Sequence, residues 1–248
     1  MPPNKTMTRG KNDDGPPEYG PLRSFGRRRS RKLSPRQAEL LDEGLNRLAL
    51  DASVPAPDRL SELFDRPVRE VWLEIGFGGG EHLLWQARHN PDVGVIACEP
   101  FIDGVVKVLD GARKDDLSNI RIYTDDVRDV LPWLPSTSVS RVFVLFPDPW
   151  PKKRHIKRRL VGGRLIGELA RIMMPDAELR LATDIPDYAR GMLLAVRQQK
   201  SFRWLARESR DWRVRPSDWP PTRYEEKAIR EGRSRYFFRF RKADSAKN

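Results

Sequence analysis

The sequence predicts an α/β protein built on a doubly wound, mainly parallel sheet. Apolar runs of strand length alternate with stretches of helical spacing along most of the chain. The run 142–146 contains no polar residue, which is typical of a strand buried on both faces of a parallel sheet. A glycine-rich turn, Gly76 to Gly80, follows another apolar run directly. Because ligands of such sheets bind at the carboxyl ends of the strands, we expect a site at that edge.

The elements follow one another in a regular order. Ser34 and Pro35 are typical of a helix start, and leucines at helical spacing extend this helix to about residue 50. Residues 52–69 form a connector with a short helix near 60–64. The expected strands are 71–75, 93–98, 120–124, 142–146, 178–182, 201–205 and 234–240. The expected later helices are 81–89, 101–114, 160–174 and 186–199. A long polar insertion, 206–233, separates the last two strands.

Composition divides the chain into three parts. Residues 1–32 are rich in Pro, Gly, Arg and Lys, so we expect a basic tail that is disordered when free. This tail is either a solvated linker or a source of phosphate contacts. Residues 33–242 form the single folded domain, and 243–248 a polar C-terminal tail.

Charge and residue usage limit the partners. The formal charge of +12 favours a polyanion, nucleic acid first and acidic membrane second. Cys98 is the one cysteine, and the three histidines lack metal-ligand spacing, so we expect neither a disulfide framework nor a metal site. No apolar run reaches the length of a membrane span, and the polar start lacks a signal-peptide core. We therefore expect a cytoplasmic protein without a membrane partner.

The glycine turn has the pattern Glu74-x-Gly76-x-Gly78-x-Gly80. Glycines permit a tight strand-to-helix turn and close approach of a ligand. The dinucleotide fingerprint needs glycine where this chain has Glu81. An acid before the first glycine instead suits a ligand that carries an ammonium group and no pyrophosphate.

Two further acids follow the next strands. Glu99 is placed to accept hydrogen bonds from a ribose diol, and Asp126 to meet an adenine amino group. Either acid alone would more often be an ordinary loop residue. Together with Glu74, at the ends of three successive strands, they favour S-adenosylmethionine as the cofactor.

The fourth strand leads into Pro-Asp148-Pro and a dense basic run. Asp148 either only ends the strand in a turn or belongs to the site. The run is either a solvated helix face or a set of phosphate contacts, and its place at the sheet edge favours the second reading. Trp150 is as well suited to pack as a lid as to stack on an extruded base.

Four segments carry a family resemblance: LEIGFGGGEHL, FPDPWPKKRHIKRRL, LATDIPDYA and TRYEEKAIREG. In this order they resemble the bacterial tRNA (guanine-N7)-methyltransferases, class I enzymes that use S-adenosylmethionine to methylate N7 of guanine at position 46 of tRNA. The match extends from about residue 29 to 241, and PDPWPKKRH with TRYE is its most specific part. Ala228 stands where the family usually has glycine.

The resemblance implies a seven-stranded Rossmann-like sheet with an antiparallel C-terminal strand, and roles for individual residues. It implies that the cofactor is bound by Glu74, Gly76, Gly78, Glu99, Asp126 and Asp148. It implies Asp148 as the catalytic residue. It implies contacts to the tRNA from Lys152, Arg154, His155, Lys157, Arg158, Arg159, Asp184, Thr222, Arg223, Tyr224 and Glu225.

The expected chemistry needs no base. N7 of guanine has an available lone pair, so in-line positioning and negative charge near the purine suffice. We therefore expect Asp148 to orient and to act electrostatically. Two alternatives stay open: a class I methyltransferase for another RNA or an exocyclic amine, and a non-catalytic RNA-binding relative. Acids in a basic cleft argue against the second, and the sequence decides nothing between monomer and homodimer.

Overall fold

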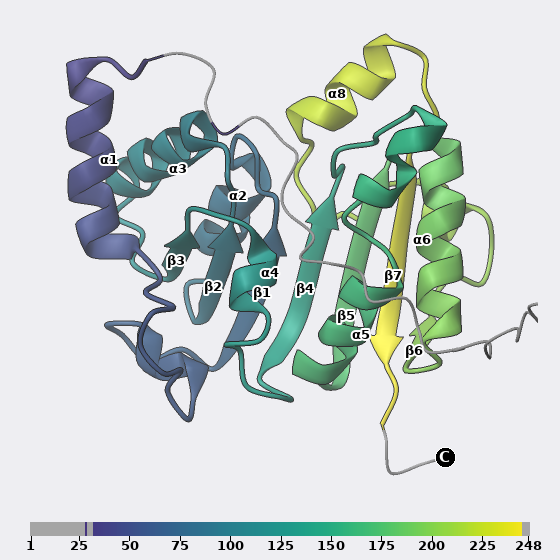
Figure 1. Cartoon of the computed structure of the whole chain (residues 1–248), viewed down its shortest axis with the longest axis horizontal. Coiled ribbons are helices and arrows are strands. Elements are labelled where there is room, and N and C mark those ends of the chain that lie inside the picture. Colours follow the sequence, from purple (N-terminus) through teal and green to yellow (C-terminus); the bar gives the residue numbers. More distant parts are fainter. Residues whose placement is uncertain (1–27, 29–31, 245–248) are drawn as a thin grey trace, which may run out of the picture.

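The computed structural model describes residue 28 and residues 32–244, which form a seven-stranded sheet (Figure 1). Its strand order is β3-β2-β1-β4-β5-β7-β6. The strands are β1 Glu70–Ile75, β2 Val93–Cys98, β3 Ile120–Tyr123, β4 Val139–Leu145, β5 Met173–Thr183, β6 Phe202–Trp204 and β7 Tyr236–Lys242. β1 to β5 are parallel, whereas β7 runs antiparallel to both β5 and β6. This confirms the predicted fold and puts β1 beside β4, where the strand order reverses.

Helices cover both faces of the sheet. Those before the fourth strand are α1 Pro35–Leu48, α2 Glu81–His89, α3 Ile102–Lys114 and α4 Val127–Val130, and those after it are α5 Gly163–Ile172, α6 Pro186–Gln198, α7 Arg210–Arg213 and α8 Arg223–Arg230. Two 3-10 helices, η1 Leu60–Leu63 and η2 Lys153–Arg158, complete the list. Along β2, Val95 and Ala97 pack with α1, α2 and α3, while Ile96 and Cys98 pack with α4, α5 and α6. The period of two along a strand therefore separates two cores.

One boundary differs clearly from the expectation. The helix predicted for 160–174 ends at Ile172, and β5 begins at Met173, five residues before the expected strand start. Pro175 explains this, because proline disfavours a helical conformation in the residue that precedes it. Met173 is buried, whereas Met174 is exposed.

The polar insertion 206–233 is more ordered than its composition suggests, since it contains α7 and α8. Trp219 from this insertion is buried against Trp72, Phe143 and Phe237 in a third, smaller core. The insertion thus packs against β1, β4 and β7, and it brings α8 over the carboxyl end of β4 (Figure 1).

Some expectations lie beyond the part of the chain that is described. The predicted tail 1–32 falls outside it except for residues 28 and 32, and so do positions 245–248 of the C-terminal tail. Among the helices of the described residues, none has the length and apolar character needed to cross a bilayer.

Candidate active site

A cavity of about 430 Å³ lies at the carboxyl ends of β1 to β4. Its lining includes many of the residues predicted to form the site: Gly76, Gly78, Glu99, Asp126, Asp148, Arg158 and Tyr224. The elements that supply them are far apart in sequence, and the parallel sheet brings their ends to one edge. The predicted location of the site therefore coincides with this cavity.

The glycine turn forms one wall of this cavity. Gly76, Gly78 and Gly80 have φ angles of 76°, 54° and 82°, a left-handed conformation that favours glycine. A Cβ atom at Gly78 would lie 3.1 Å from Cε2 of Tyr224. A Cβ atom at Gly104 of α3 would lie only 2.0 Å from the carbonyl oxygen of Gly78. The turn is thus confined between α3 and Tyr224.

Glu99 ties the turn to the end of β2. Its Oε2 accepts a hydrogen bond from the Gly78 N–H at 2.7 Å, and its Oε1 accepts one from the Phe101 N–H at 3.0 Å. Burial raises the pKa of Glu99, and these two hydrogen bonds offset part of that effect. Each carboxylate oxygen keeps further acceptor capacity, so Glu99 can also receive hydroxyl donors from a ligand.

Asp126 presents an acceptor without a donor. Its Oδ1 accepts from the backbone N–H of Arg128 at 3.0 Å and from Nε of the same residue at 2.9 Å. Its Oδ2 is buried and has no hydrogen-bond partner within the described residues. Buried polar atoms are nearly always paired, so this oxygen fits a donor on a bound molecule, such as an aromatic amino group.

Glu74 is not among the residues that line this cavity. Its Oε2 lies 2.8 Å from Nδ1 of the buried His82. Nε2 of His82 lies 3.1 Å from the Gln86 amide nitrogen, which also donates to the carbonyl oxygen of Asp218 at 2.9 Å. This series of hydrogen bonds links β1 to the insertion that precedes α8. Sequence reasoning missed His82, since nothing in a histidine after a glycine turn indicates its partner.

The loop after β4 is conformationally strained on both sides of Asp148. Phe146 and Trp150 have φ angles of 50° and 41°, which cost about 1–3 kcal/mol each for residues other than glycine. Both line the cavity together with Asp148. Asp148 as a residue is exposed, yet partial burial of its carboxyl group raises the pKa of that group. The geometry therefore favours a site residue over a simple turn.

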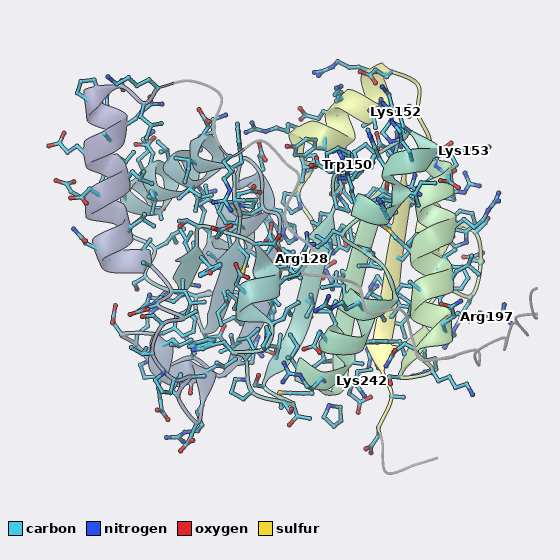
Figure 2. All side chains as sticks on the ribbon, viewed as in Figure 1. Arg128, Trp150, Lys152, Lys153, Arg197 and Lys242 are labelled. Carbon is cyan, nitrogen blue, oxygen red and sulfur yellow. The ribbon has the colours of Figure 1, made fainter. Side chains whose placement is uncertain are left out.

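The basic run forms η2 next to this loop, where Trp150, Lys152 and Lys153 lie near one another (Figure 2). The Arg158 guanidinium lies 5.1 Å from the centre of the Trp150 ring. Four cationic side chains of the basic run are exposed and form no ion pair among residues 32–244: Lys152, Lys153, Arg154 and Lys157. They are available to an external anion.

Arg159 differs from the rest of the run. Its Nη1 lies 2.8 Å from Oδ2 of Asp187, and its Nε donates to the carbonyl oxygen of Pro149 at 2.9 Å. Its side chain is only 8% exposed. Arg159 therefore fastens the strained loop to α6.

Of the predicted site residues 222–225, one lines the cavity and the other three make contacts within the protein. Tyr224 reaches the cavity. Thr222 caps α8 by accepting from the Glu225 N–H at 3.3 Å, and Arg223 pairs with Glu81. Glu225 is buried, with its Oε2 3.0 Å from Nε of Arg215. These contacts hold α8 so that Tyr224 faces the glycine turn.

Asp184 is also engaged, since its Oδ2 lies 2.7 Å from Nη2 of Arg233. This pair joins the end of β5 to the segment before β7. Sequence reasoning missed Arg233 because the two positions are distant in the chain.

Comparisons with known proteins agree with this geometry. A family model described as "Putative methyltransferase" matches residues 68–238. Two solved structures share the fold at a TM-score of 0.50: the 16S rRNA methyltransferase KamB, 18% identical and covering 71% of this chain and 89% of its own, and the 16S rRNA (adenine(1408)-N(1))-methyltransferase of Catenulisporales acidiphilia, 13% identical and covering 79% and 92%.

Curated relatives match over nearly their whole length. The tRNA (guanine-N(7)-)-methyltransferase of Chelativorans sp. strain BNC1 is 46% identical, with 90% of this chain and 97% of the relative covered. The protein of the same name from Ruegeria pomeroyi is 47% identical, with 90% and 96% covered. The chain therefore belongs to the tRNA (guanine-N(7)-)-methyltransferase family.

Proposed function

We propose that this protein transfers the methyl group of S-adenosylmethionine to N7 of guanine at position 46 of tRNA. Family membership supports the reaction class and the tRNA substrate. The observation that carries the proposal is one cavity lined by the glycine turn, Glu99, Asp126 and Asp148, with Arg158 of the basic run in the same lining. We assign this catalytic domain to residues 33–242, because β7 ends at Lys242.

The cavity suits S-adenosylmethionine chemically. The unpaired Oδ2 of Asp126 would accept from the adenine amino group, and Glu99 would accept from the ribose hydroxyls. The backbone at Gly76 and Gly78 leaves room for close approach. When bound, this cofactor supplies an electrophilic methyl group. Glu74, held by His82, would act from behind the turn through its negative charge.

Asp148 would favour the transition state electrostatically. The purine becomes cationic as N7 is methylated, and a nearby carboxylate stabilises that charge in a site where water is scarce. Alignment of N7 with the methyl group can contribute up to about 7–11 kcal/mol. Asp148 must be ionised for its role, so a raised pKa brings its protonation closer to the working pH.

The basic surface would hold the RNA backbone. Lys152, Arg154 and Lys157 are free to contact phosphates, and Arg158 reaches both the cavity and Trp150. This arrangement would place the RNA with one base directed into the cavity.

The experiment is transfer of radiolabelled methyl from S-adenosylmethionine to unmodified tRNA transcripts that carry guanine or adenine at position 46. We expect label only in the guanine transcript. Label in both would keep the methyltransferase and reject the position. No label in either, with cofactor bound, would reject the enzyme in favour of an RNA-binding relative.

A further inference from the structure

A second cavity, of about 350 Å³, is lined by Arg213, Ile229, Gly232, Arg233, Ser234 and Arg235. We propose that it binds a phosphodiester group of the RNA, next to the nucleotide that is methylated. This inference rests on the proposed function, because it assigns a further contact to the same substrate. None of its cationic residues belongs to the basic run after β4.

The second cavity lies at the same edge of the sheet as the first. Arg233 is paired with Asp184 at the end of β5. Arg235 immediately precedes β7, whose first residue, Tyr236, pairs with Thr183 at the last position of β5. Both cavities therefore lie above the carboxyl end of the parallel strands.

Helix α8 connects the two cavities. Tyr224, near its N-terminus, lines the first, and Ile229, near its C-terminus, lines the second. Five residues of α-helix correspond to about 7.5 Å of rise. The two cavities thus lie beside opposite ends of α8, a short helix that one RNA strand can span.

Charge in this cavity is only partly compensated. Arg233 pairs with two acids, Asp184 and Glu231. Arg235 forms no ion pair or hydrogen bond in the described part of the chain, and its Nε is buried without a partner. The charge of Arg235 acts to lower the pKa of Glu225, but this acid already forms an ion pair with Arg215. The cavity therefore contains a guanidinium with unsatisfied donors.

Arg213 adds a second cation without an acid partner among residues 32–244. Its guanidinium lies 4.3 Å from the ring centre of Trp212 and 5.3 Å from that of Tyr236. Stacking of this kind orients the planar group and leaves its edge N–H groups for a ligand. Ser234 lines the same cavity and contributes a hydroxyl donor.

Donors without acceptors select an anion with several acceptor oxygens. Guanidinium groups bind phosphate oxygens in a bidentate manner, and buried donors are nearly always satisfied. The methylated RNA brings phosphodiesters to within a nucleotide or two of the first cavity. A backbone phosphate of that RNA therefore fits both the chemistry and the position.

The test is the variant Arg235→Gln, with Arg197→Gln as the matched control. Arg197 is an exposed arginine of α6 that lies far from Trp150 and Lys152 (Figure 2). We expect Arg235→Gln to weaken tRNA binding about tenfold and to raise the KM for tRNA accordingly. The slope of log K against log salt should flatten by about 0.7, as for one lost phosphate contact. Cofactor affinity should not change, and Arg235→Lys should recover part of the loss.

The two proposals fail in distinguishable ways. Wild-type protein that methylates no tRNA would reject the proposed function. Active wild-type protein together with an Arg235→Gln variant of unchanged affinity and salt slope would reject only the phosphate site. A loss of cofactor affinity equal to the loss of tRNA affinity would also reject it, since that outcome indicates a structural role.

Single methylphosphonate linkages identify the phosphate. Each linkage near the target guanine is replaced in turn by this uncharged group, and tRNA binding is measured with both proteins. We expect one linkage at which replacement weakens binding to wild type about tenfold and has no further effect on Arg235→Gln. Equal losses in both proteins at every linkage would overturn the assignment.

Discussion

Replacing Gly104 by alanine tests how closely α3 must approach the glycine turn. The new Cβ would lie 2.0 Å from the Gly78 carbonyl oxygen, a backbone atom. Real Cβ contacts are essentially never shorter than 3.0 Å, so helix and turn must separate by about 1 Å. The turn cannot yield freely, since its N–H groups at Gly76 and Gly78 donate to Cys98 and Glu99.

The free-energy change follows from two opposed effects. Overpacking of a tight contact costs about 1–3 kcal/mol. Alanine in place of a helical glycine stabilises the folded state by at most about 1 kcal/mol, because its helix propensity is higher. We therefore expect Gly104→Ala to lower the free energy of unfolding by up to about 2 kcal/mol. Because Gly78 lines the cavity, we also expect cofactor affinity to fall about tenfold or more.

Urea denaturation and calorimetric titration with S-adenosylmethionine measure the two effects. Gly191→Ala in α6 is the control, because a Cβ there meets nothing within 4 Å. It should raise the free energy of unfolding by about 0.5–1 kcal/mol and leave cofactor affinity unchanged. A Gly104→Ala protein with the stability and cofactor affinity of wild type would refute the reasoning.

Three further substitutions test the site and its support. In Asp126→Asn the amide oxygen keeps the two hydrogen bonds from Arg128, so the NH₂ group turns toward the cavity. The cofactor dissociation constant should therefore rise about tenfold, with tRNA binding intact. An unchanged dissociation constant in calorimetry would count against the assigned contact. Methyl transfer by wild type should decline on the acid side at a pH above 3.8, the ordinary pKa of aspartate, because the pKa of Asp148 is raised and only its ionised form acts; Asp148→Asn should be slow at every pH, and an unaltered pH–rate profile would contradict the electrostatic role. Glu178 lies between Arg180 and Arg239, and although burial raises its pKa, hydrogen bonds and charges of these arginines lower it overall. A lowered folded-state pKa means stability that is present above the unfolded value of about 4.5 and lost as pH falls through the folded value. Glu178→Gln should therefore cost about 3 kcal/mol at pH 7, with the difference from wild type narrowing below pH 4.5 in urea titrations; a penalty independent of pH would contradict the ion-pair explanation.

Local patterns predicted much of the site. The glycines at 76, 78 and 80 indicated a tight turn, and the structure gives all three positive φ angles. Acids at strand ends were predictable because parallel strands end at one edge, and Glu99, Asp126 and Asp148 all line the cavity. The start of β5 was missed because helical spacing outweighed the effect of Pro175.

Pairings between distant segments were not predictable from such patterns. Arg159 belongs by composition to a basic run, but Asp187 and Pro149 capture its guanidinium. Glu74 belongs by position to the cofactor turn, but His82 holds its carboxylate away from the cavity lining. In both cases the sequence indicates a charge and its neighbourhood, and only the packing of neighbouring elements selects the partner.

The sequence by itself determined the succession of strands and helices along the chain, the glycine turn and the acids at the strand ends. These features depend on periodicity and on the conformational limits of glycine and proline. Tertiary structure alone decided which charges are free. It brought Tyr224 against Gly78 and, within the described part of the chain, left Oδ2 of Asp126 without a donor and Arg235 without an ion pair. Such contacts join residues far apart in the chain, so they depend on how elements pack and not on any local preference.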